Sequence, residues 1–270
     1  MCIRDSLYTL PSVVDDIDAK ITHVIRGEDH VTNSGAQIEI FRALSDHLPT
    51  FTHTPLLVWK DGSPLSKRLG SLSMGELKEQ GFEPLAICSL LAKIGTSDAI
   101  EARASMELLK DEFSFDKIGR APARFSDDEL LLINGRLLYE MPYANVKDHL
   151  EALNVGGGEA FWNLIRSNVS KVSDTAGWST VIYSPMPGQI EDEDKAFCEA
   201  AANALPDKIT PETWAEWTET LKIDHARKGK ALFMPLRRAL TGRERGPEMG
   251  KLLELLGADK ARARLRGETA

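Results

Sequence analysis

Strand-like patterns occur only near the beginning of this 270-residue chain, and helical patterns dominate the remainder. Ile21–Ile25 alternates β-branched residues, and Thr54–Trp59 is a second run of strand-forming residues. Between these runs, apolar residues recur at helical spacing over Ile38–Leu44, behind a helix cap expected at Thr32 or Asn33. A strand, a polar loop and a helix in this order predict an α/β unit whose functional loop follows the strand.

The rest of the chain is predicted to be helical. Up to Pro142, apolar spacing favours helices over Met74–Gln80, Pro84–Lys93, Met106–Glu112 and Asp127–Tyr139. Beyond it, Gly, Pro and Asp breaks separate helical segments at 145–153, 159–169, 192–204, 210–221, 230–241 and 247–256. We therefore expect an α/β part followed by an all-helical bundle.

Composition narrows the class of protein. The hydrophobic fraction of 42% and charged fraction of 27% are typical of a folded globular chain. No stretch approaches the ~18 to 20 apolar residues that a membrane span requires. The cysteines, Cys2, Cys88 and Cys198, are too far apart for a disulfide framework or a CxxC zinc site. We expect a cytoplasmic protein that binds neither zinc nor a membrane.

Charge is distributed unevenly along the chain. His225–Ala270 holds twelve Lys and Arg against five Asp and Glu, a net charge of +7, whereas residues 1–224 carry −15. A basic end on an acidic body is typical of a protein that docks an anion with one region. Solvated Arg and Lys on a helical end would give the same composition.

A loop with adjacent cations follows the second predicted strand. Leu65-Ser-Lys-Arg-Leu-Gly70 places Lys67 and Arg68 where they can close over a polyphosphate and neutralise charge on a leaving group. The alternative is an exposed turn whose polar residues only solvate the surface.

The loop after the first predicted strand has a different chemistry. In Arg26-Gly-Glu-Asp-His30, Arg26 offers a planar fork that fits a carboxylate. Asp29 can accept hydrogen bonds from ribose hydroxyls or an amino group. The nearby His23 and His30 do not have the spacing of an HExxH motif, so no metal site is expected.

Several motifs occur together in a fixed order and spacing. They are Tyr8–Asp16, Ile25–Asn33, Thr54–Leu57, Leu65–Arg68, Ile118–Arg124, Asn134–Arg136, Ala231–Arg237 and Leu240–Arg243. From Leu7 to its last residue the chain resembles the bacterial glutamyl-tRNA synthetases, a family of class I aminoacyl-tRNA synthetases. The resemblance implies ATP-dependent activation of L-glutamate to glutamyl-adenylate and transfer to the 3′ end of tRNA(Glu), with Mg²⁺ accompanying ATP.

The resemblance also assigns substrate residues by position. Tyr8 and Arg26 resemble glutamate-site residues, with Arg26 gripping a substrate carboxylate. Asp29 resembles the acidic position that contacts ATP, and Leu56 and Leu57 resemble the backbone edge that meets adenine.

Leu65–Arg68 resembles the KMSKS-type loop of this family. The resemblance implies catalytic positions at Ser66, Lys67 and Arg68, with Lys67 neutralising the ATP phosphates as pyrophosphate leaves. Pro64 stands beside the motif where the family often has Lys or another polar residue, which makes a stiffer loop the expectation.

The helical remainder resembles tRNA-binding domains. Arg237 and Arg243 are candidates for tRNA contact, and Arg120 and Arg124 for the inner elbow of the tRNA, because Lys and Arg supply most nucleic-acid affinity through phosphates. For each, an arginine that only solvates the surface is the alternative.

The resemblance implies a class I fold in parts. We expect an α/β Rossmann-type catalytic remnant, its C-terminal half, followed by an all-α stem-contact and anticodon-binding region. The expected boundaries are a non-native leader at 1–6, the catalytic part at 7–72, the stem-contact domain at 73–142 and the anticodon-binding domain at 143–270.

One departure from the family bears on activity. The family begins with a glutamate-contacting Arg and a HIGH-type nucleotide motif, and neither is present in these 270 residues. A nucleotide site needs residues from both halves of the fold. Our hypothesis is that the chain alone is inactive and that the family's usual monomeric state applies. The alternative is a tRNA-binding module without ligase activity.

Overall fold

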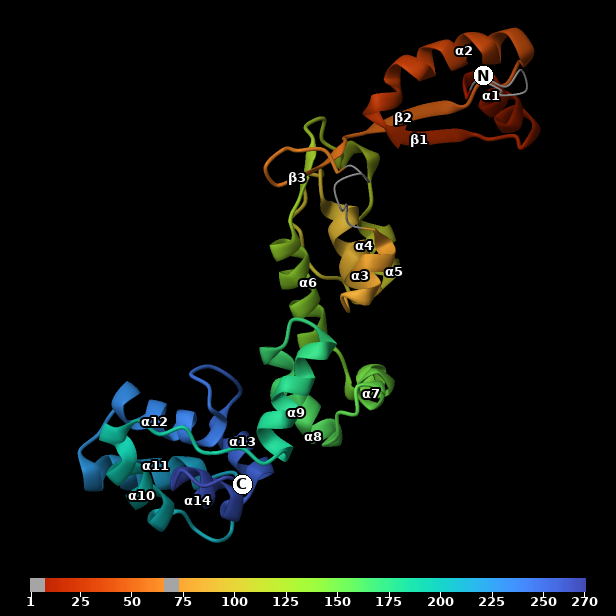
Figure 1. Ribbon diagram of the computed structural model, residues 1–270. Coiled ribbons are helices and arrows are strands. Elements are labelled where there is room, and N and C mark those ends of the chain that lie inside the picture. Colours follow the sequence, from red (N-terminus) through yellow and green to blue (C-terminus); the bar gives the residue numbers. More distant parts are fainter. Residues whose placement is uncertain (1–7, 66–72) are drawn as a thin grey trace, which may run out of the picture. The chain divides into compact units, whose positions relative to one another are not determined.

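The computed structural model describes residues 8–65 and 73–270 (Figure 1). The chain divides into two compact units, residues 1–133 and 134–270, and the boundary lies inside helix α6 (Asp127–Glu140). No helix in the described part of the chain combines the length and the apolar character needed to cross a membrane.

The first unit begins with a parallel βαβ arrangement. Its elements are α1 (Thr9–Asp18), β1 (His23–Gly27), α2 (Val31–Leu44) and β2 (Thr50–Thr54). β1 and β2 pair in parallel, and α2 makes the crossover that parallel strands require. In Figure 1 both helices lie beside this two-stranded sheet; Val13 of α1 and Phe41 of α2 are buried, and the Phe41 ring packs edge-on against Phe51 of β2.

Two details of this region differ from the sequence expectation. A 3₁₀ turn over Glu28–His30 runs directly into α2, so His30 occupies the cap position expected at Thr32 or Asn33. Helix α1 was not predicted from the sequence, and no capping side chain marks its start, because Tyr8 occupies the N-cap and forms no side-chain cap hydrogen bond.

The predicted bounds of the second strand were wrong. Thr54–Trp59 contains the end of β2 and a separate strand, β3 (Leu57–Trp59), divided at Pro55, which has no N–H for a ladder. β3 pairs in parallel with β4 (Ala123–Phe125), which lies in a region expected to be helical. The all-helical expectation is therefore wrong at this point, because β4 owes its conformation to a partner 66 positions earlier, at Leu57↔Ala123 in the register.

The helices predicted for the rest of the first unit are confirmed. They are α3 (Met74–Glu79), α4 (Pro84–Lys93), α5 (Met106–Glu112) and α6. Local signals explain their starts: Ser73 and Glu76 form a reciprocal capping box, and Pro84 occupies the first turn of α4.

The second unit is helical throughout. Its helices are α7 (Tyr143–Ala152), α8 (Gly158–Ile165), α9 (Thr175–Tyr183), α10 (Lys195–Ala204), α11 (Thr213–His225), α12 (Lys230–Thr241), α13 (Met249–Leu256) and α14 (Ala258–Leu265). Residues 134–270 are all described, and within them strand pairing is limited to a single bridge between Pro187 and Thr269. The helical prediction for this region is confirmed, although it missed α9 and α14.

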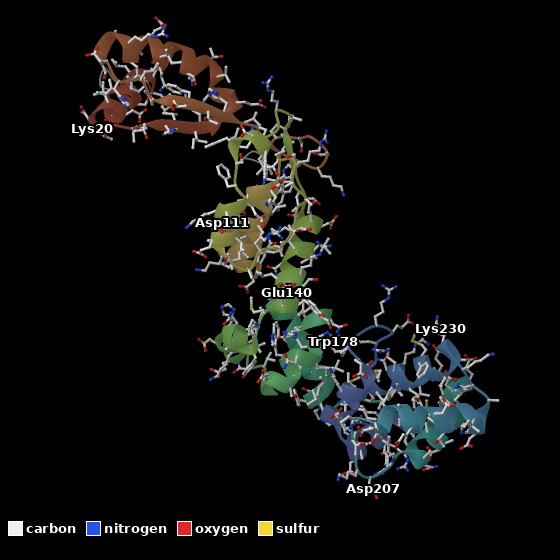
Figure 2. The ribbon with its side chains drawn as sticks, turned by 180° about the vertical axis from the view of Figure 1, so that it is seen from behind. Lys20, Asp111, Glu140, Trp178, Asp207 and Lys230 are labelled. Atoms are coloured by element: carbon white, nitrogen blue, oxygen red, sulfur yellow. The ribbon has the colours of Figure 1, made fainter. Side chains whose placement is uncertain are left out.

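One continuous core holds these helices together. Aromatic and aliphatic residues from most of them are buried in it, among them Trp162, Trp178 and Leu236. Trp178, marked in Figure 2, is 4% exposed. Helix α14 differs in composition, because half of its residues are charged and one of these, Arg264, is fully buried.

Candidate functional site

The strongest candidate site surrounds Arg26 at the carboxyl end of β1. Its Nη1 donates to the Tyr8 hydroxyl at 3.5 Å, and its Nη2 donates to Ser34 Oγ on α2. Its Cζ lies 5.4 Å from the centre of the Phe51 ring. All of these partners are uncharged, and no described carboxylate lies within ion-pair distance of Arg26.

No described carboxylate compensates the charge of Arg26, and its guanidinium has spare donors. Its Nε is buried and has no hydrogen-bond partner among the described residues. A guanidinium presents five N–H donors in a fork that matches a carboxylate. Because buried N–H groups are normally satisfied, this arrangement indicates a place for an anionic ligand.

The structure brings together the two residues assigned to glutamate. Tyr8 precedes α1 and is 54% exposed, while Arg26 is half-buried, so their contact lies at the surface of the unit. The centre of the Tyr8 ring also lies 5.8 Å from the centre of the His30 ring, so His30 borders the same site.

Two residues assigned to ATP also converge, on Gly27. A Cβ atom at Gly27 would lie 2.5 Å from Asp29 Oδ1 and 3.4 Å from Leu56 Cδ2. The absence of a side chain at this position lets Asp29 fold back over the end of β1. The Leu56 side chain is 38% exposed, and the Leu56 carbonyl accepts from the backbone N–H of Ala123 at 2.8 Å. Leu57 begins β3 and is half-buried.

The cationic loop lies outside the described residues. Ser66, Lys67 and Arg68 all fall in the gap between 65 and 73. The turn before it is well defined: Asp61 Oδ1 accepts from the N–H of Ser63 at 2.8 Å and from its hydroxyl at 2.6 Å. The two hydrogen bonds lower the pKa of Asp61 below its ordinary value.

The two arginine candidates of the first unit are exposed. Arg124 lies on β4 and its Nη1 donates to the Lys60 carbonyl at 2.8 Å, which braces the turn that leads into the cationic loop. Arg120 lies in the exposed segment before β4 and forms no hydrogen bond or ion pair with any described residue. Both guanidinium groups keep donors that face solvent.

The two arginine candidates of the second unit are used inside it. Arg237 Nη2 donates to the Pro247 carbonyl at 3.1 Å, and burial lowers the pKa of Arg237. Arg243 Nη2 donates to the Gly177 carbonyl at 3.2 Å, and its Cζ lies 4.3 Å from the centre of the Trp178 ring. Arg243 and the Nη2 of Arg237 thus hold segments of the domain together, while the Nη1 of Arg237 is buried and has no hydrogen-bond partner among the described residues.

The structure indicates other cations that sequence reasoning missed. In the basic segment, four side chains are exposed and form no hydrogen bond or ion pair with the described residues: Lys228, Lys230, Arg245 and Lys251. Lys230, labelled in Figure 2, is the first residue of α12 and is exposed. Sequence could not separate these four from the paired arginines, because pairing depends on residues far away in the chain.

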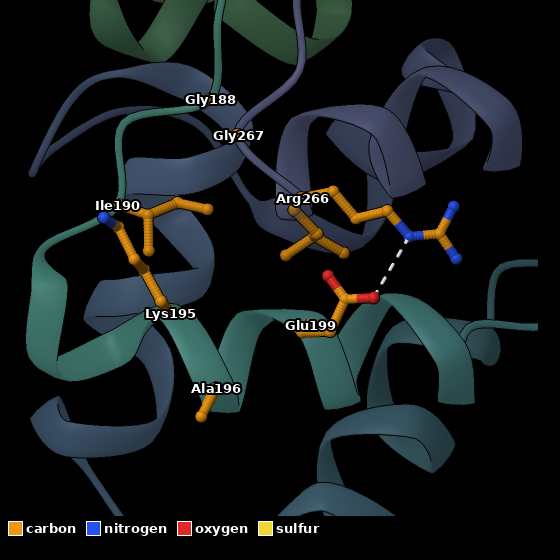
Figure 3. Close-up of a pocket in the computed structure, with 8 residues that line it drawn as sticks. Gly188, Ile190, Lys195, Ala196, Glu199, Arg266 and Gly267 are labelled. Carbon is orange, nitrogen blue, oxygen red and sulfur yellow. Dashed lines mark ion pairs between the residues drawn. The ribbon is translucent and has the colours of Figure 1, made fainter.

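A pocket of about 590 Å³ lies beside α10 in the second unit (Figure 3). Its two cations already have carboxylate partners. Lys195 Nζ lies 2.7 Å from Asp192, and Arg266 Nε lies 3.6 Å from Glu199. The pocket therefore offers little unpaired charge to an anion.

A group of acids beside this pocket is also paired. Glu191, Glu193 and Asp194 bring carboxylate oxygens within 4.8 Å of one another. Glu191 is paired with Arg238, and Asp194 with Arg227 at 2.5 Å. Two of the three charges are therefore compensated by arginine, as in a structural cluster.

Comparison with known proteins identifies both parts of the chain. Residues 6–131 match the family described as "tRNA synthetases class I (E and Q), catalytic domain", and residues 143–268 match "Anticodon binding domain". Glutamate–tRNA ligase 2 of Hyphomonas neptunium is 55% identical over 261 residues, covering 96% of this chain and 59% of that protein. Glutamate–tRNA ligase 1 of Maricaulis maris is 51% identical over 266 residues, covering 98% and 59%.

A solved structure has the same fold. The glutamate tRNA ligase from Elizabethkingia meningosepticum superimposes with a TM-score of 0.77 at 23% identity, over 96% of this chain and 59% of that protein. This chain thus spans about three fifths of the length of the relatives that it matches.

Proposed function

The chain belongs to the class I tRNA synthetases of the glutamate and glutamine group, and we propose that it forms part of a glutamate–tRNA ligase. The enzyme activates L-glutamate with ATP, forming glutamyl-adenylate, and transfers the glutamyl group to the 3′ end of tRNA(Glu). The observation that carries this proposal is Arg26, a half-buried guanidinium with neutral partners only, in a chain 55% identical to such a ligase.

Each substrate has its own residues in this proposal. Arg26 binds a carboxylate of glutamate, and the Tyr8 hydroxyl, 3.5 Å from Arg26 Nη1, completes that side of the site. Asp29 accepts hydrogen bonds from the nucleotide, beside Leu56. ATP enters with Mg²⁺ as part of the substrate, and Lys67 neutralises the phosphates as pyrophosphate leaves.

The tRNA is bound through phosphates. In the second unit we assign this to Lys228, Lys230, Arg245 and Lys251, the exposed cations of the basic segment whose side chains form no hydrogen bond or ion pair with a described residue. In the first unit Arg120 and Arg124 retain donors for the same purpose. Such contacts are electrostatic and weaken as salt concentration rises. The enzyme works as a monomer in the cytoplasm, where tRNA and ATP are found.

The 270 residues alone do not catalyse the reaction in this proposal. They contain no HIGH-type motif. Positioning of reactants contributes ~7 to 11 kcal/mol in such reactions, so a site lacking one set of positioning groups loses most of its rate. The second candidate function, a tRNA-binding module, is favoured by the intact helical unit that matches an anticodon-binding domain.

The test is ATP–pyrophosphate exchange dependent on both glutamate and tRNA(Glu), with filter binding of tRNA(Glu) measured alongside. It uses the 270-residue chain and a chimera that adds, in native order, the part of the Hyphomonas neptunium ligase that this chain does not match. We expect exchange by the chimera, its loss in Arg26→Ala and Lys67→Ala, and salt-sensitive tRNA binding by both proteins. Exchange by the 270-residue chain would overturn its proposed inactivity, and an inactive chimera would contradict the ligase assignment.

A further inference from the structure

A hydrogen-bonded chain runs behind Arg26, away from its exposed donors. Arg26 Nη2 donates to Ser34 Oγ, and Ser34 Oγ is hydrogen-bonded to His53 Nε2 at 2.7 Å. The three residues come from β1, α2 and β2 in turn. Ser34 is 4% exposed, so this junction is closed to solvent.

The parallel sheet explains why these groups meet. Arg26 and His53 are register partners on β1 and β2, which places their side chains on the same face of the sheet. The crossover helix α2 covers that face and brings Ser34 between them. No short-range motif produces this arrangement, because His53 lies 27 positions after Arg26.

Counting hydrogens gives the direction of each bond. A hydroxyl has one hydrogen and can accept two more bonds. Ser34 Oγ donates to the His30 carbonyl at 3.1 Å, and it accepts from Arg26. With the Ser34 hydrogen directed to the His30 carbonyl, the remaining bond is one that His53 Nε2 donates, and we therefore expect a proton on Nε2.

This junction limits the freedom of the guanidinium. Arg26 is held through Nη2 by Ser34, while Phe51 lies under its face. Orientation of a binding group before the substrate arrives reduces the entropy lost on binding. The N–H of Nε and the donors of Nη1 are not used by Ser34, and they remain for Tyr8 and a ligand.

We propose that Ser34 and His53 are positioning residues that hold the guanidinium of Arg26 in the orientation in which it binds the glutamate carboxylate. The assignment of that ligand rests on the proposed function. The orientation itself is a property of the 270-residue chain and can be measured without catalysis.

The first experiment is nitrogen-15 NMR of the full 270-residue chain with labelled arginine and histidine, with the Arg26 signals assigned from Arg26→Lys. We expect Arg26 to show slowed rotation of its Nη groups and His53 to carry a proton on Nε2. Ser34→Ala should restore fast rotation at Arg26, and Ser34→Thr should keep it slow. An unchanged Arg26 signal in Ser34→Ala, or an unprotonated His53 Nε2, would overturn the proposal.

Two controls separate this effect from general loss of packing. Ser89→Ala removes another buried hydroxyl, which accepts from the N–H of Arg103 at 3.0 Å, and should leave the Arg26 signals unchanged. His53→Gln keeps a side-chain N–H donor and should preserve slow rotation better than His53→Leu. Equal effects of the two His53 variants would mean that the ring only fills space.

The second experiment measures kinetics in the chimera described above. Ser34→Ala should raise KM for glutamate about tenfold, the cost of one charge-assisted hydrogen bond, with kcat and KM for ATP within about twofold. Ser34→Thr should restore KM. An unchanged KM for glutamate would overturn the positioning role. If the unmodified chimera shows no glutamate-dependent exchange, the proposed function fails instead, and the NMR result still decides whether Ser34 orients Arg26.

Discussion

Arg26 in the first unit and Arg264 in the second are both partly or wholly enclosed arginines, but they are satisfied in opposite ways. Arg264 is fully buried, and its guanidinium donates to four backbone carbonyls, those of Val181, Leu240, Ser184 and Ala270. Arg26 donates to two hydroxyls, is half-buried and keeps a buried Nε without a described partner. The first is fully occupied by its own chain, whereas the second has donors left for a ligand.

The carbonyls that Arg264 binds explain its structural role. Those of Val181 and Ser184 lie at the end of α9, and that of Leu240 lies in the last turn of α12. The last carbonyls of a helix have no partner within the helix and carry partial negative charge. One guanidinium therefore closes two helix ends at once, and its charge is offset by those carbonyls although burial lowers the pKa of Arg264.

The largest effect should follow from removing this arginine. Arg264→Met leaves buried carbonyls unsatisfied and should reduce the free energy of unfolding by about 3 to 5 kcal/mol. The measurement is denaturant unfolding followed by tryptophan fluorescence, since four of the five tryptophans lie in residues 134–270.

Arg26→Met is the matched comparison. It should change the free energy of unfolding, followed by circular dichroism, by less than about 1 kcal/mol, because the side chain is half-buried, the Tyr8 hydroxyl is exposed, and the buried Ser34 hydroxyl keeps its bonds to His30 and His53. A similar loss of stability in both variants would remove the distinction between an occupied and an available arginine.

The second prediction tests the packing around Arg264. A Cβ at Gly188 would lie 1.7 Å from the Arg264 carbonyl oxygen, and that backbone is fixed by its helix. Gly188→Ala should therefore cost about 1 to 3 kcal/mol of unfolding free energy, measured in the same way. Gly156→Ala is the control, because no atom lies within 4 Å of its added Cβ, and a comparable loss there would contradict the steric explanation.

The sequence predicted what local patterns determine. Helices α4 and α5 have the predicted bounds, because Pro84 and Ser105 mark their starts and apolar residues recur at helical spacing. Strand β4 was missed because its pairing with β3 comes from distant residues. Helix α14 was missed because its buried side consists of two small alanines, Leu265 and Arg264, and spacing rules count an arginine as exposed.

The same limit applies to the candidate site. Motif order assigned Arg26 and Tyr8 jointly, and the structure places them in contact. Motif order gave no indication of Ser34 or His53, because the contact between them depends on the register of the sheet. Charge counting marked the basic segment, but only tertiary contacts separate an occupied cation such as Arg243 from an exposed one.

The third prediction extends the comparison to tRNA binding. Replacing Lys228, Lys230, Arg245 and Lys251 by Ala should weaken tRNA(Glu) binding and reduce the slope of log affinity against log salt by about 0.7 to 1 for each cation that contacts a phosphate. Filter binding across a salt series gives the slope.

Lys222→Ala is the control for that series, because this exposed lysine is already paired with Glu219 at 2.9 Å. Arg237→Ala should lower stability while leaving the slope nearly unchanged, since its Nη2 is bound to the Pro247 carbonyl. If the slope falls in Arg237→Ala and not in the four-fold variant, the assignment of exposed and occupied cations is wrong.

The smallest expected effect is the pH dependence of stability that comes from Asp98 and Glu112 in the first unit, whose charges are paired with cations of the same unit. Lys93 is 5% exposed and its Nζ lies 3.0 Å from Asp98 and 2.6 Å from Glu112. Lys117 and then Lys93 lower the pKa of Asp98 below its ordinary 3.8, while Lys93 and then Arg103 lower the pKa of Glu112 below its ordinary 4.5.

Lowered carboxyl pKa values fix the sign of the pH dependence. The stability that these pairs contribute is fully present above the ordinary values, and it is lost as pH falls below them through the lower values of the folded state. Hydrogen exchange at the amides of α4 and α5 should therefore show weaker protection as pH falls below about 4.

The variants Asp98→Asn and Glu112→Gln should be less stable near neutral pH, and they should lose less stability on acidification. The effect should be modest, because both carboxylates are about a quarter to a third exposed and solvent screens them. An acid dependence equally steep in both variants would show that other carboxylates are responsible, and that pairing around Lys93 serves packing alone.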